Sequence, residues 1–460
     1  MHRLLTLILC LLLGPSMAHA ARIGLTDDPA YGCLVELSGT IEPGDAARLR
    51  AAIEEAARLP RHDGTIYVNA DLADGRPNFG IYTPLHLCLD SPGGSLSEAM
   101  DLIDIVHGHL GTVIRAGARC ESACALVFMA GSHSTETDFG LSVNRFLHVE
   151  GRLGFHAPSL TVAEGRYDAD TVERAYRVSV SVTELIFRNL VRFRFSPSLA
   201  ARMHATPAED MFYVTTVAQA ARWGIAVLGV DRPSALSDAV IRTACGNLYL
   251  SALDRTTSDP DVWPNTLIGM DEPVERLADQ GYSYRAFGQE AAGACIVNAE
   301  VPSDEYAVSN SFWGTAPLVR DSVWATANVR DAEPPVFFGF LQNYMAWPGD
   351  LPLDALPRNG QARVLNTQGT CTVFDGADRL TDSDPCTRTR QAMADGGMTD
   401  THLWPSGART LLAYQGGTVL VNGRPGSNSY WPLDPVQGAP RPTCTLNSGS
   451  GNRFCFQPDP

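Results

Sequence analysis

A serine between two cysteines is the first place in the sequence where side-chain chemistry is expected. Ser122 lies in Cys120-Glu-Ser-Ala-Cys124, after a run typical of a strand at 112–115 and within an apolar run at 122–130 that predicts a short helix. A hydroxyl at the start of a helix lies where a developing negative charge is stabilised. Ser122 can therefore act as a nucleophile, with the backbone N–H of Ala123 as an oxyanion donor. The same serine would also suit the N-cap of that helix, which is a purely structural role.

Two consecutive glycines, in Ser91-Pro-Gly-Gly-Ser95, supply a second part of the same chemistry. They follow a predicted strand at 85–89 and precede a predicted helix at 96–110. Glycine lets the backbone turn sharply and present N–H groups to a negative oxygen, with the helix dipole behind them. We therefore expect the N–H of Gly94 to be the second oxyanion donor, although Pro-Gly-Gly is also common in plain turns.

A histidine and an aspartate complete the candidate set. His156, in Gly154-Phe-His-Ala-Pro158 at the end of a predicted extended segment, could accept the serine proton, and Asp210 could orient the imidazole ring. Taken alone, such a histidine is more often structural or exposed. The open alternatives to Asp210 are three nearby acids: Asp168, Asp170 and Glu209.

Alternating strands and helices must hold these residues in place. Strands are predicted at 33–41, 85–89 and 112–115, an extended segment at 146–155, and helices at 43–59, 96–110, 122–130, 171–195 and 215–225. Strands separated by helices in this order form parallel βαβ units. After about residue 235 Pro, Gly, Asn and Trp become frequent between short β-type runs such as 410–414 and 418–423, which indicates a mainly β region.

The cysteines indicate an oxidising compartment. Of the 11 cysteines, Cys10 lies in a predicted signal peptide, and the others form an even set, as disulfide bonds require. A zinc site is the rival interpretation, but no Cys-x-x-Cys or paired Cys/His spacing supports it. Proximity along the chain suggests these pairs: Cys33 with Cys88, Cys120 with Cys124, Cys245 with Cys295, Cys371 with Cys386, and Cys444 with Cys455.

The first residues of the chain predict export. Arg3 precedes an apolar run at 4–13, and Ala18-His-Ala20 is typical of a signal-peptide cleavage site. No later apolar run approaches the roughly 20 residues that a bilayer-spanning helix needs. We therefore expect a periplasmic or secreted protein with no membrane span after cleavage.

Composition excludes several classes of mechanism. The chain has 51 acidic and 35 basic residues, a net charge of −16, and every basic residue is Arg because the sequence contains no Lys. Ser–Lys dyads, Schiff-base lysines and the P-loop lysine are therefore excluded. The acidic balance argues against nucleic-acid binding. No metal or cofactor is expected, since His107 and His109 fit a solvated helix end better than a ligand pair.

Taken together and in this order, the motifs resemble those of the Clp protease proteolytic subunit. The resemblance rests on Ser-Pro-Gly-Gly-Ser, Ser-Ala at a helix start, Phe-His-Ala-Pro, and Asp-x-Phe before a helix ending in Trp-Gly-Ile, over residues 30–232. It implies the crotonase-like fold and a Ser-His-Asp triad. Carried over motif by motif, it implies Ser122 as nucleophile, His156 as base, Asp210 as acid, and the backbones of Gly94 and Ala123 as oxyanion donors.

The chain also departs from that family. Cysteines flank the candidate nucleophile in place of the usual small residues, and there is an apparent insertion at about 134–144. An exported protein would lack the ATP-driven unfoldase that Clp proteases dock. The related signal peptide peptidase A type needs a Ser–Lys dyad, which the absence of lysine excludes.

The sequence thus predicts an α/β protein in three parts: a signal peptide at 1–20, a ClpP/crotonase-like domain of repeated βαβ units at 21–234, and a disulfide-stapled, mainly β accessory region at 235–460. The expected activity is that of an ATP-independent periplasmic serine peptidase acting on a peptide or protein substrate. The resemblance also allows a homo-oligomer. The alternative is a non-catalytic binding or assembly protein on the same fold.

Overall fold

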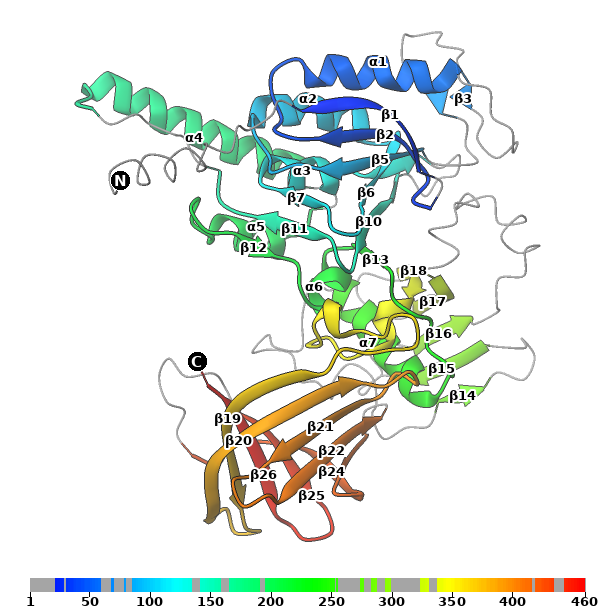
Figure 1. Ribbon diagram of the computed structural model, residues 1–460, viewed down its shortest axis with the longest axis vertical. Coiled ribbons are helices and arrows are strands. Elements are labelled where there is room, and N and C mark those ends of the chain that lie inside the picture. The colour runs from blue at the N-terminus through cyan, green and yellow to red at the C-terminus, as the bar shows by residue number, and fades with distance from the viewer. Residues whose placement is uncertain are drawn as a thin grey trace, which may run out of the picture. The chain divides into compact units, whose positions relative to one another are not determined.

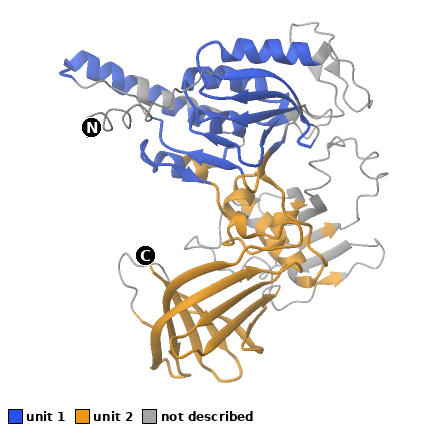
Figure 2. Cartoon of the chain, in the orientation of Figure 1, with its two compact units in different colours: residues 1–145, 151–195, 201–213 blue, residues 146–150, 196–200, 214–460 orange. Residues whose placement is uncertain are grey.

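The computed structural model describes residues 21–28, 30–58, 68–69, 78–79, 85–134, 141–158, 165–190, 195–252, 254, 274–276, 283–287, 294–298, 323–330, 337–415, 418–433 and 442–459. The predicted signal peptide at 1–20 lies outside the described residues, as do residues 135–140 of the apparent insertion. The chain divides into two compact units (Figure 2). The first comprises 1–145, 151–195 and 201–213, and the second comprises 146–150, 196–200 and 214–460. The domain boundary after residue 234 stays a prediction.

A six-stranded sheet has the order β1 (Arg22–Asp28), β2 (Cys33–Ser38), β5 (Leu85–Asp90), β6 (Leu110–Ile114), β10 (Arg145–His148) and β13 (Ala226–Leu228) (Figure 1). β2, β5 and β6 run parallel, as do β10 and β13, which agrees with the predicted βαβ units. β1 is an antiparallel edge strand that the sequence did not reveal. Two short hairpins, β3 (Val68–Asn69) with β4 (Asn78–Phe79) and β8 (Ser132–Ser134) with β9 (Leu141–Val143), lie outside this sheet.

Three helices bring apolar residues onto the six-stranded sheet: α1 (Asp45–Arg58), α2 (Leu96–Val106) and α3 (Ala123–Met129). All seven residues of α3 are buried. The predicted helix at 96–110 was too long, because α2 ends at Val106, Gly108 turns the chain at φ 82°, and Leu110 already begins β6. Side chains without solvent exposure form the core around these helices: Leu37, Leu87, Leu89, Leu102, Ile103, Val113 and Phe128.

The remaining helices are α4 (Ala169–Asn189), α5 (Pro197–His204), α6 (Val217–Arg222) and α7 (Asp238–Ala252). α4 is shorter than the predicted 171–195 helix at its C-terminal end. α6 begins with a capping box between Thr216 and Gln219. α7 was missed, because the composition after residue 235 pointed to strands. None of the helices in the described part of the chain is long and apolar enough to cross a membrane.

A small three-stranded sheet, β12-β11-β7, positions the candidate site. β7 (Arg119–Glu121) runs parallel to β11 (Arg152–Phe155), with Glu121 opposite Gly154. β12 (Phe212–Tyr213) lies antiparallel on the other side of β11. Ser122 follows β7 directly and His156 follows β11 directly, so this sheet sets where both residues leave their strands.

The second unit is rich in strands. A five-stranded antiparallel sheet contains β14 (Glu275–Arg276), β15 (Ser283–Phe287), β16 (Ala294–Asn298), β17 (Val323–Arg330) and β18 (Phe337–Gln342). Two 3-10 turns follow, at Asn343–Ala346 and Leu353–Ala355. The last eight strands close into an antiparallel barrel (Figure 1, yellow to red). They are β19 (Leu365–Phe374), β20 (Leu380–Ala392), β21 (Met398–Leu403), β22 (Arg409–Gln415), β23 (Thr418–Val421), β24 (Arg424–Ser429), β25 (Thr443–Asn447) and β26 (Arg453–Pro458).

The barrel interior combines an apolar core with a buried ion pair. Trp404, Leu412, Phe454 and Phe456 belong to one buried cluster. Beside them, the guanidinium of Arg390 donates two hydrogen bonds of 2.7 Å to the carboxylate of Asp400. Closing the sheet into a barrel removes the exposed edges that an open antiparallel sheet would present.

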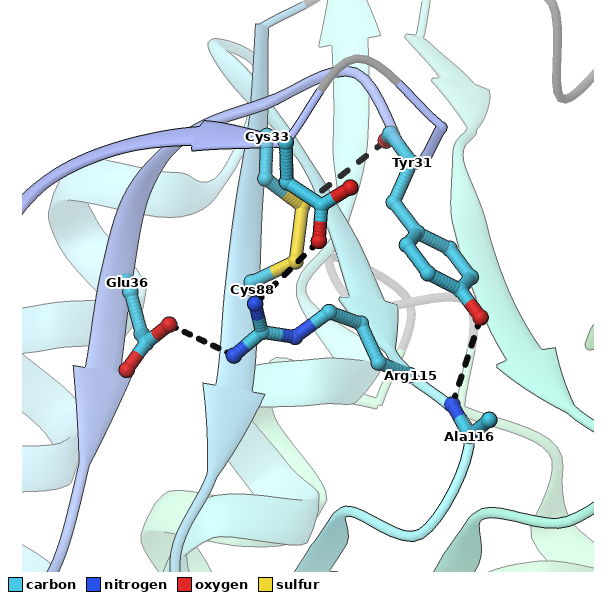
Figure 3. The surroundings of a disulfide bond; sticks show 7 residues. Tyr31, Cys33, Glu36, Cys88, Arg115 and Ala116 are labelled. Carbon is cyan, nitrogen blue, oxygen red and sulfur yellow. Dashed lines mark hydrogen bonds and ion pairs between the residues drawn. A yellow bond between two sulfur atoms is a disulfide. The ribbon is translucent and has the colours of Figure 1, made fainter.

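The structure joins the ten cysteines of the described region in the five pairs suggested by proximity. Figure 3 shows Cys33–Cys88, which links β2 to β5. Beside it Arg115 binds Glu36 at 2.5 Å and Asp28 at 3.2 Å, so a salt-bridge network reinforces the same edge of the sheet. This set of disulfides fits an oxidising extracellular compartment.

Candidate active site

The backbone of Ser122 has a conformation that few non-glycine residues adopt. Its φ is 57° and its ψ is −124° at the N-cap position of α3, and its side chain makes no capping hydrogen bond. The other described non-glycine residues with positive φ are all Asp or Asn, which tolerate that region better. Ser122 therefore occupies the cap position without capping the helix. Such strain concentrates at functional sites, where surrounding structure maintains it.

Main-chain hydrogen bonds on both sides keep Ser122 in place. Its N–H donates to the carbonyl of Gly154 at 3.0 Å, and its own carbonyl accepts from Ala125 at 3.0 Å. One residue earlier, the N–H of Glu121 donates to the carbonyl of Ser91 at 3.0 Å. The serine is therefore held between the end of β7, the end of β11 and the segment that follows β5.

The two glycines after β5 have different neighbours. At Gly93 (φ 96°) an added Cβ would lie 2.7 Å from Cβ of Ser122 and 3.0 Å from the backbone nitrogen of Ala123. At Gly94 (φ 146°) it would overlap the backbone of Ile41. Gly93 is thus the glycine that lies against the serine, a contact that the sequence did not reveal.

The backbone N–H groups of Gly93, Gly94 and Ala123 differ in their hydrogen-bond partners. The N–H of Gly93 donates to Oγ of Ser91 at 3.0 Å. By contrast, neither the N–H of Gly94 nor that of Ala123 donates to another residue in the described part of the chain. An oxyanion hole needs N–H donors of this kind, left free by the fold and attached to rigid elements.

His156 is half-buried directly after β11, and a backbone contact sets its tautomer. Its Nδ1 lies 2.8 Å from the carbonyl oxygen of Ala157. Because a carbonyl oxygen can only accept, Nδ1 is the donor in this contact, and in the neutral imidazole Nε2 is then the nitrogen with the lone pair. The next peptide is anchored too, since the N–H of Ala157 donates to the carbonyl of Thr206 at 2.9 Å. The imidazole is therefore prepared to accept a proton at Nε2.

Ser122 and His156 each follow the end of one of two paired strands, and the last residue of β7, Glu121, lies opposite Gly154 rather than opposite the residue before His156. No hydrogen bond joins the two side chains among the described contacts. Serine–base pairs are often loose without substrate and tighten when it binds. The structure therefore places the two residues on adjoining strand ends without a completed nucleophile–base contact.

Among the described contacts, no hydrogen bond or ion pair joins Asp210 to His156. Asp210 is exposed in a turn where its N–H donates to the carbonyl of Pro207 at 3.1 Å, and the position on Nδ1 is taken by the Ala157 carbonyl. Among the alternatives, Asp168 accepts from the N–H of Thr171 at 2.7 Å as the N-cap of α4. Asp170 and Glu209 are exposed. The role of Asp210 stays a prediction.

A buried carboxylate next to the serine was not anticipated from the sequence. Glu121 accepts hydrogen bonds from Arg152 at 2.9 Å and from the hydroxyl of Tyr213 at 3.0 Å, and it lies 3.6 Å from Arg119. Burial and the bond to Glu121 raise the pKa of the Tyr213 phenol. Because Glu121, Arg152 and Tyr213 belong to β7, β11 and β12, this cluster fastens the three strands behind the site.

The described residues contain no group of three or more His, Cys, Asp or Glu side chains placed to hold a metal ion. Nδ1 of His107 lies 3.5 Å from Oγ of Ser132, and Nδ1 of His148 accepts from the N–H of Glu150 at 3.1 Å. Both of these histidines take part in local polar contacts.

No protein-family model matches the chain. No curated protein matches it either. Among solved structures, the chain is similar to a point mutant of ClpP1 from Listeria monocytogenes, with 14% sequence identity and a TM-score of 0.27. That alignment covers 42% of this chain and 89% of the other. Such a weak likeness does not establish a family or an activity, so the function has to be inferred from the geometry around Ser122.

Proposed function

We propose that this protein is an exported, ATP-independent serine peptidase in which Ser122 is the nucleophile and His156 the general base. The observation that carries the proposal is the conformation of Ser122. It is an uncapped serine with positive φ at a strand-to-helix junction, next to the free N–H of Ala123. Nothing in a purely structural N-cap calls for that strain.

The proposed reaction uses the groups in order. Nε2 of His156 accepts the proton of Ser122 as Oγ attacks the carbonyl carbon of a peptide bond. The negative oxygen that forms accepts hydrogen bonds from the N–H groups of Gly94 and Ala123. The C–N bond then breaks as His156 donates the proton to the leaving amine, and water hydrolyses the acyl-enzyme by the same steps in reverse. In this account the Ala157 carbonyl orients the imidazole.

The substrate class and the compartment have separate support. A peptide substrate is proposed because the ordered motifs around Gly94, Ser122 and His156 resemble those of Clp proteases. A periplasmic or secreted location is supported by the predicted signal peptide and by the disulfides. Independence from ATP is supported by two sequence features: the chain has no lysine for a P-loop of its own, and the predicted export would separate it from an ATP-driven unfoldase. A homo-oligomer is proposed on the resemblance alone.

One observation favours a second candidate, a non-catalytic protein that binds peptides or organises an assembly on the same fold. The described contacts contain no hydrogen bond between Ser122 and His156 and none between His156 and Asp210. A binding protein would keep the scaffold without needing either contact.

The two candidates differ in turnover. The oxidised mature protein would be incubated with a defined library of unmodified peptides, and new termini would be identified by mass spectrometry. The peptidase account expects cleavage products from the wild type and none from Ser122→Ala, while Ser97→Ala, which alters an exposed serine on α2, keeps full activity. Peptides retained but left intact by the wild type would support the binding protein and contradict the peptidase.

A further inference from the structure

A disulfide spans the proposed nucleophile. Cys120, in β7, is bonded to Cys124, in the first turn of α3, so the closed ring contains Ser122 itself. Both cysteines are fully buried, with 0% of their surface exposed. The bond therefore joins the strand before the serine directly to the helix after it.

The two ends of this bridge are anchored independently of each other. Cys120 lies opposite Leu153 of β11 and also forms a β-bridge with Ser91. Cys124 belongs to α3, in which every residue is buried. A covalent link between two fixed elements limits how far the backbone of the three residues between the cysteines can relax.

Ser122 is the residue that would relax. Its positive φ is disfavoured for a residue with a Cβ and persists only where the surroundings impose it. The hydrogen bond from its N–H to Gly154 restrains one side of the serine, and the disulfide restrains both. Rotation of the Ser122 backbone would turn both Oγ of Ser122 and the neighbouring N–H of Ala123 away from the substrate carbonyl.

The bridge is also poorly placed to stabilise the fold as a whole. Its cysteines are separated by 4 positions, against 55 for Cys33–Cys88 and 50 for Cys245–Cys295. A disulfide restricts the unfolded chain less as the loop that it closes becomes shorter. Its main effect is therefore expected locally, around the serine.

We propose that the Cys120–Cys124 disulfide is a positioning element of the active site. It holds Ser122 in the conformation that aims Oγ and the N–H of Ala123 at the same substrate carbonyl. This inference rests on the proposed function, because it concerns the reactivity of Ser122. Cys120 and Cys124 touch no reacting atom in this account and act through the serine between them.

The test compares Cys120→Ala/Cys124→Ala with wild type and with a matched control, Cys444→Ala/Cys455→Ala, which removes a buried disulfide between paired strands of the barrel. The rate of Ser122 labelling would be measured at several concentrations of a fluorophosphonate probe. These data give two quantities: the maximal rate constant of labelling, and the probe concentration at which the rate is half maximal. We expect the site variant to lose about 10- to 100-fold in the maximal rate constant with an unchanged half-saturating concentration. The control variant should label at the wild-type rate.

Circular dichroism and thermal unfolding show whether each variant is folded. A folded site variant that labels at the wild-type rate would overturn the inference. A wild type that does not label at all would instead contradict the proposed function, so the two failures are distinguishable.

If the site variant does not fold, the wild type provides the test. A phosphine and one water molecule reduce a fraction of the disulfide to two thiols, and the phosphine takes the water oxygen to become a phosphine oxide. Iodoacetamide then alkylates those thiols, and the fluorophosphonate probe is added last. Trypsin releases Ser122 and both cysteines on one peptide, because the flanking arginines are Arg119 and Arg145. Probe confined to peptides with an unmarked, intact disulfide supports the inference, and equal labelling of both forms overturns it.

Discussion

Gly93 lies so close to Ser122 that a Cβ on the glycine would come within 2.7 Å of Cβ of the serine. It would also lie 2.7 Å from the carbonyl oxygen of Glu121. Neither neighbour is the flexible end of a long side chain, so one of the two backbones would have to move. The glycine turn after β5 and the serine at the start of α3 thus form one packed unit.

Gly93→Ala is therefore expected to disturb the site more than the fold. The added methyl group should push the backbone at Ser122 away and lower probe labelling at least about tenfold. It should reduce the free energy of unfolding by roughly 1–3 kcal/mol. Labelling kinetics and chemical denaturation measure the two effects.

Gly44→Ala is the matched control. Gly44 has φ 98°, close to the 96° of Gly93, but nothing lies within 4 Å of an added Cβ. The Gly44→Ala variant should lose only the stability that a positive φ costs a residue with a Cβ, because no clash is added. Its rate of probe labelling should equal that of the wild type. Equal labelling by wild type and Gly93→Ala would contradict the packed arrangement.

The barrel should depend on its buried ion pair. The side chains of Arg390 and Asp400 are 10% and 2% exposed. Asp400→Asn would leave a buried guanidinium without its main counter-charge, so we expect a loss of about 3–5 kcal/mol in the free energy of unfolding.

Asp350→Asn is the control for this pair, because Asp350 contacts the same guanidinium at 2.6 Å but is 60% exposed. Exposed pairs contribute about 0–1 kcal/mol. Denaturant titration of both variants checks the difference. Similar losses for the two aspartates would contradict the assigned importance of burial.

His402 should make the barrel sensitive to acid. Burial lowers the pKa of His402 to about 4, from an ordinary value of 6.5. Between these values the unfolded chain binds a proton that the folded barrel does not, so stability is present above about pH 6.5 and is lost as the pH falls towards 4. The expected loss in the free energy of unfolding is about 3 kcal/mol.

Denaturation can be followed by tryptophan fluorescence, to which Trp404 of the barrel contributes; its ring centroid lies 6.1 Å from that of Phe454. The slope of stability against pH between 4 and 6.5 should be reduced in His402→Leu. An identical slope in wild type and variant would show that another group causes the acid sensitivity.

Elements that depend on local patterns were predicted well from the sequence. The strand before the Gly-Gly turn and the helix after Ser122 agree with β5 and α3 within a residue or so, because apolar runs and turn residues determine them locally. β7 was missed, since its three residues pair only with strands far away in the sequence. The closed barrel was predicted only as a mainly β region, because strand closure leaves no local signal.

The candidate site shows the same division. Ser122 and His156 could be proposed from the sequence because serine and histidine are distinctive side chains and stand there in recognisable surroundings, and their roles stay predictions. The acceptor for Nδ1 of His156 is the backbone carbonyl of Ala157. Every residue has a backbone carbonyl, so the residue types in the sequence could not predict this contact. Nor could the sequence distinguish which glycine lies against the serine, since Gly93 and Gly94 differ only in their three-dimensional contacts.

The central claim is that Ser122 is an activated nucleophile, and covalent labelling tests it most directly. The oxidised mature protein would be treated with a fluorophosphonate, digested with trypsin and mapped by mass spectrometry. We predict a single adduct on Ser122 that is absent from Ser122→Ala and strongly reduced in His156→Ala, while Ser97→Ala labels like the wild type. A folded wild type that carries no adduct on Ser122 would contradict the account.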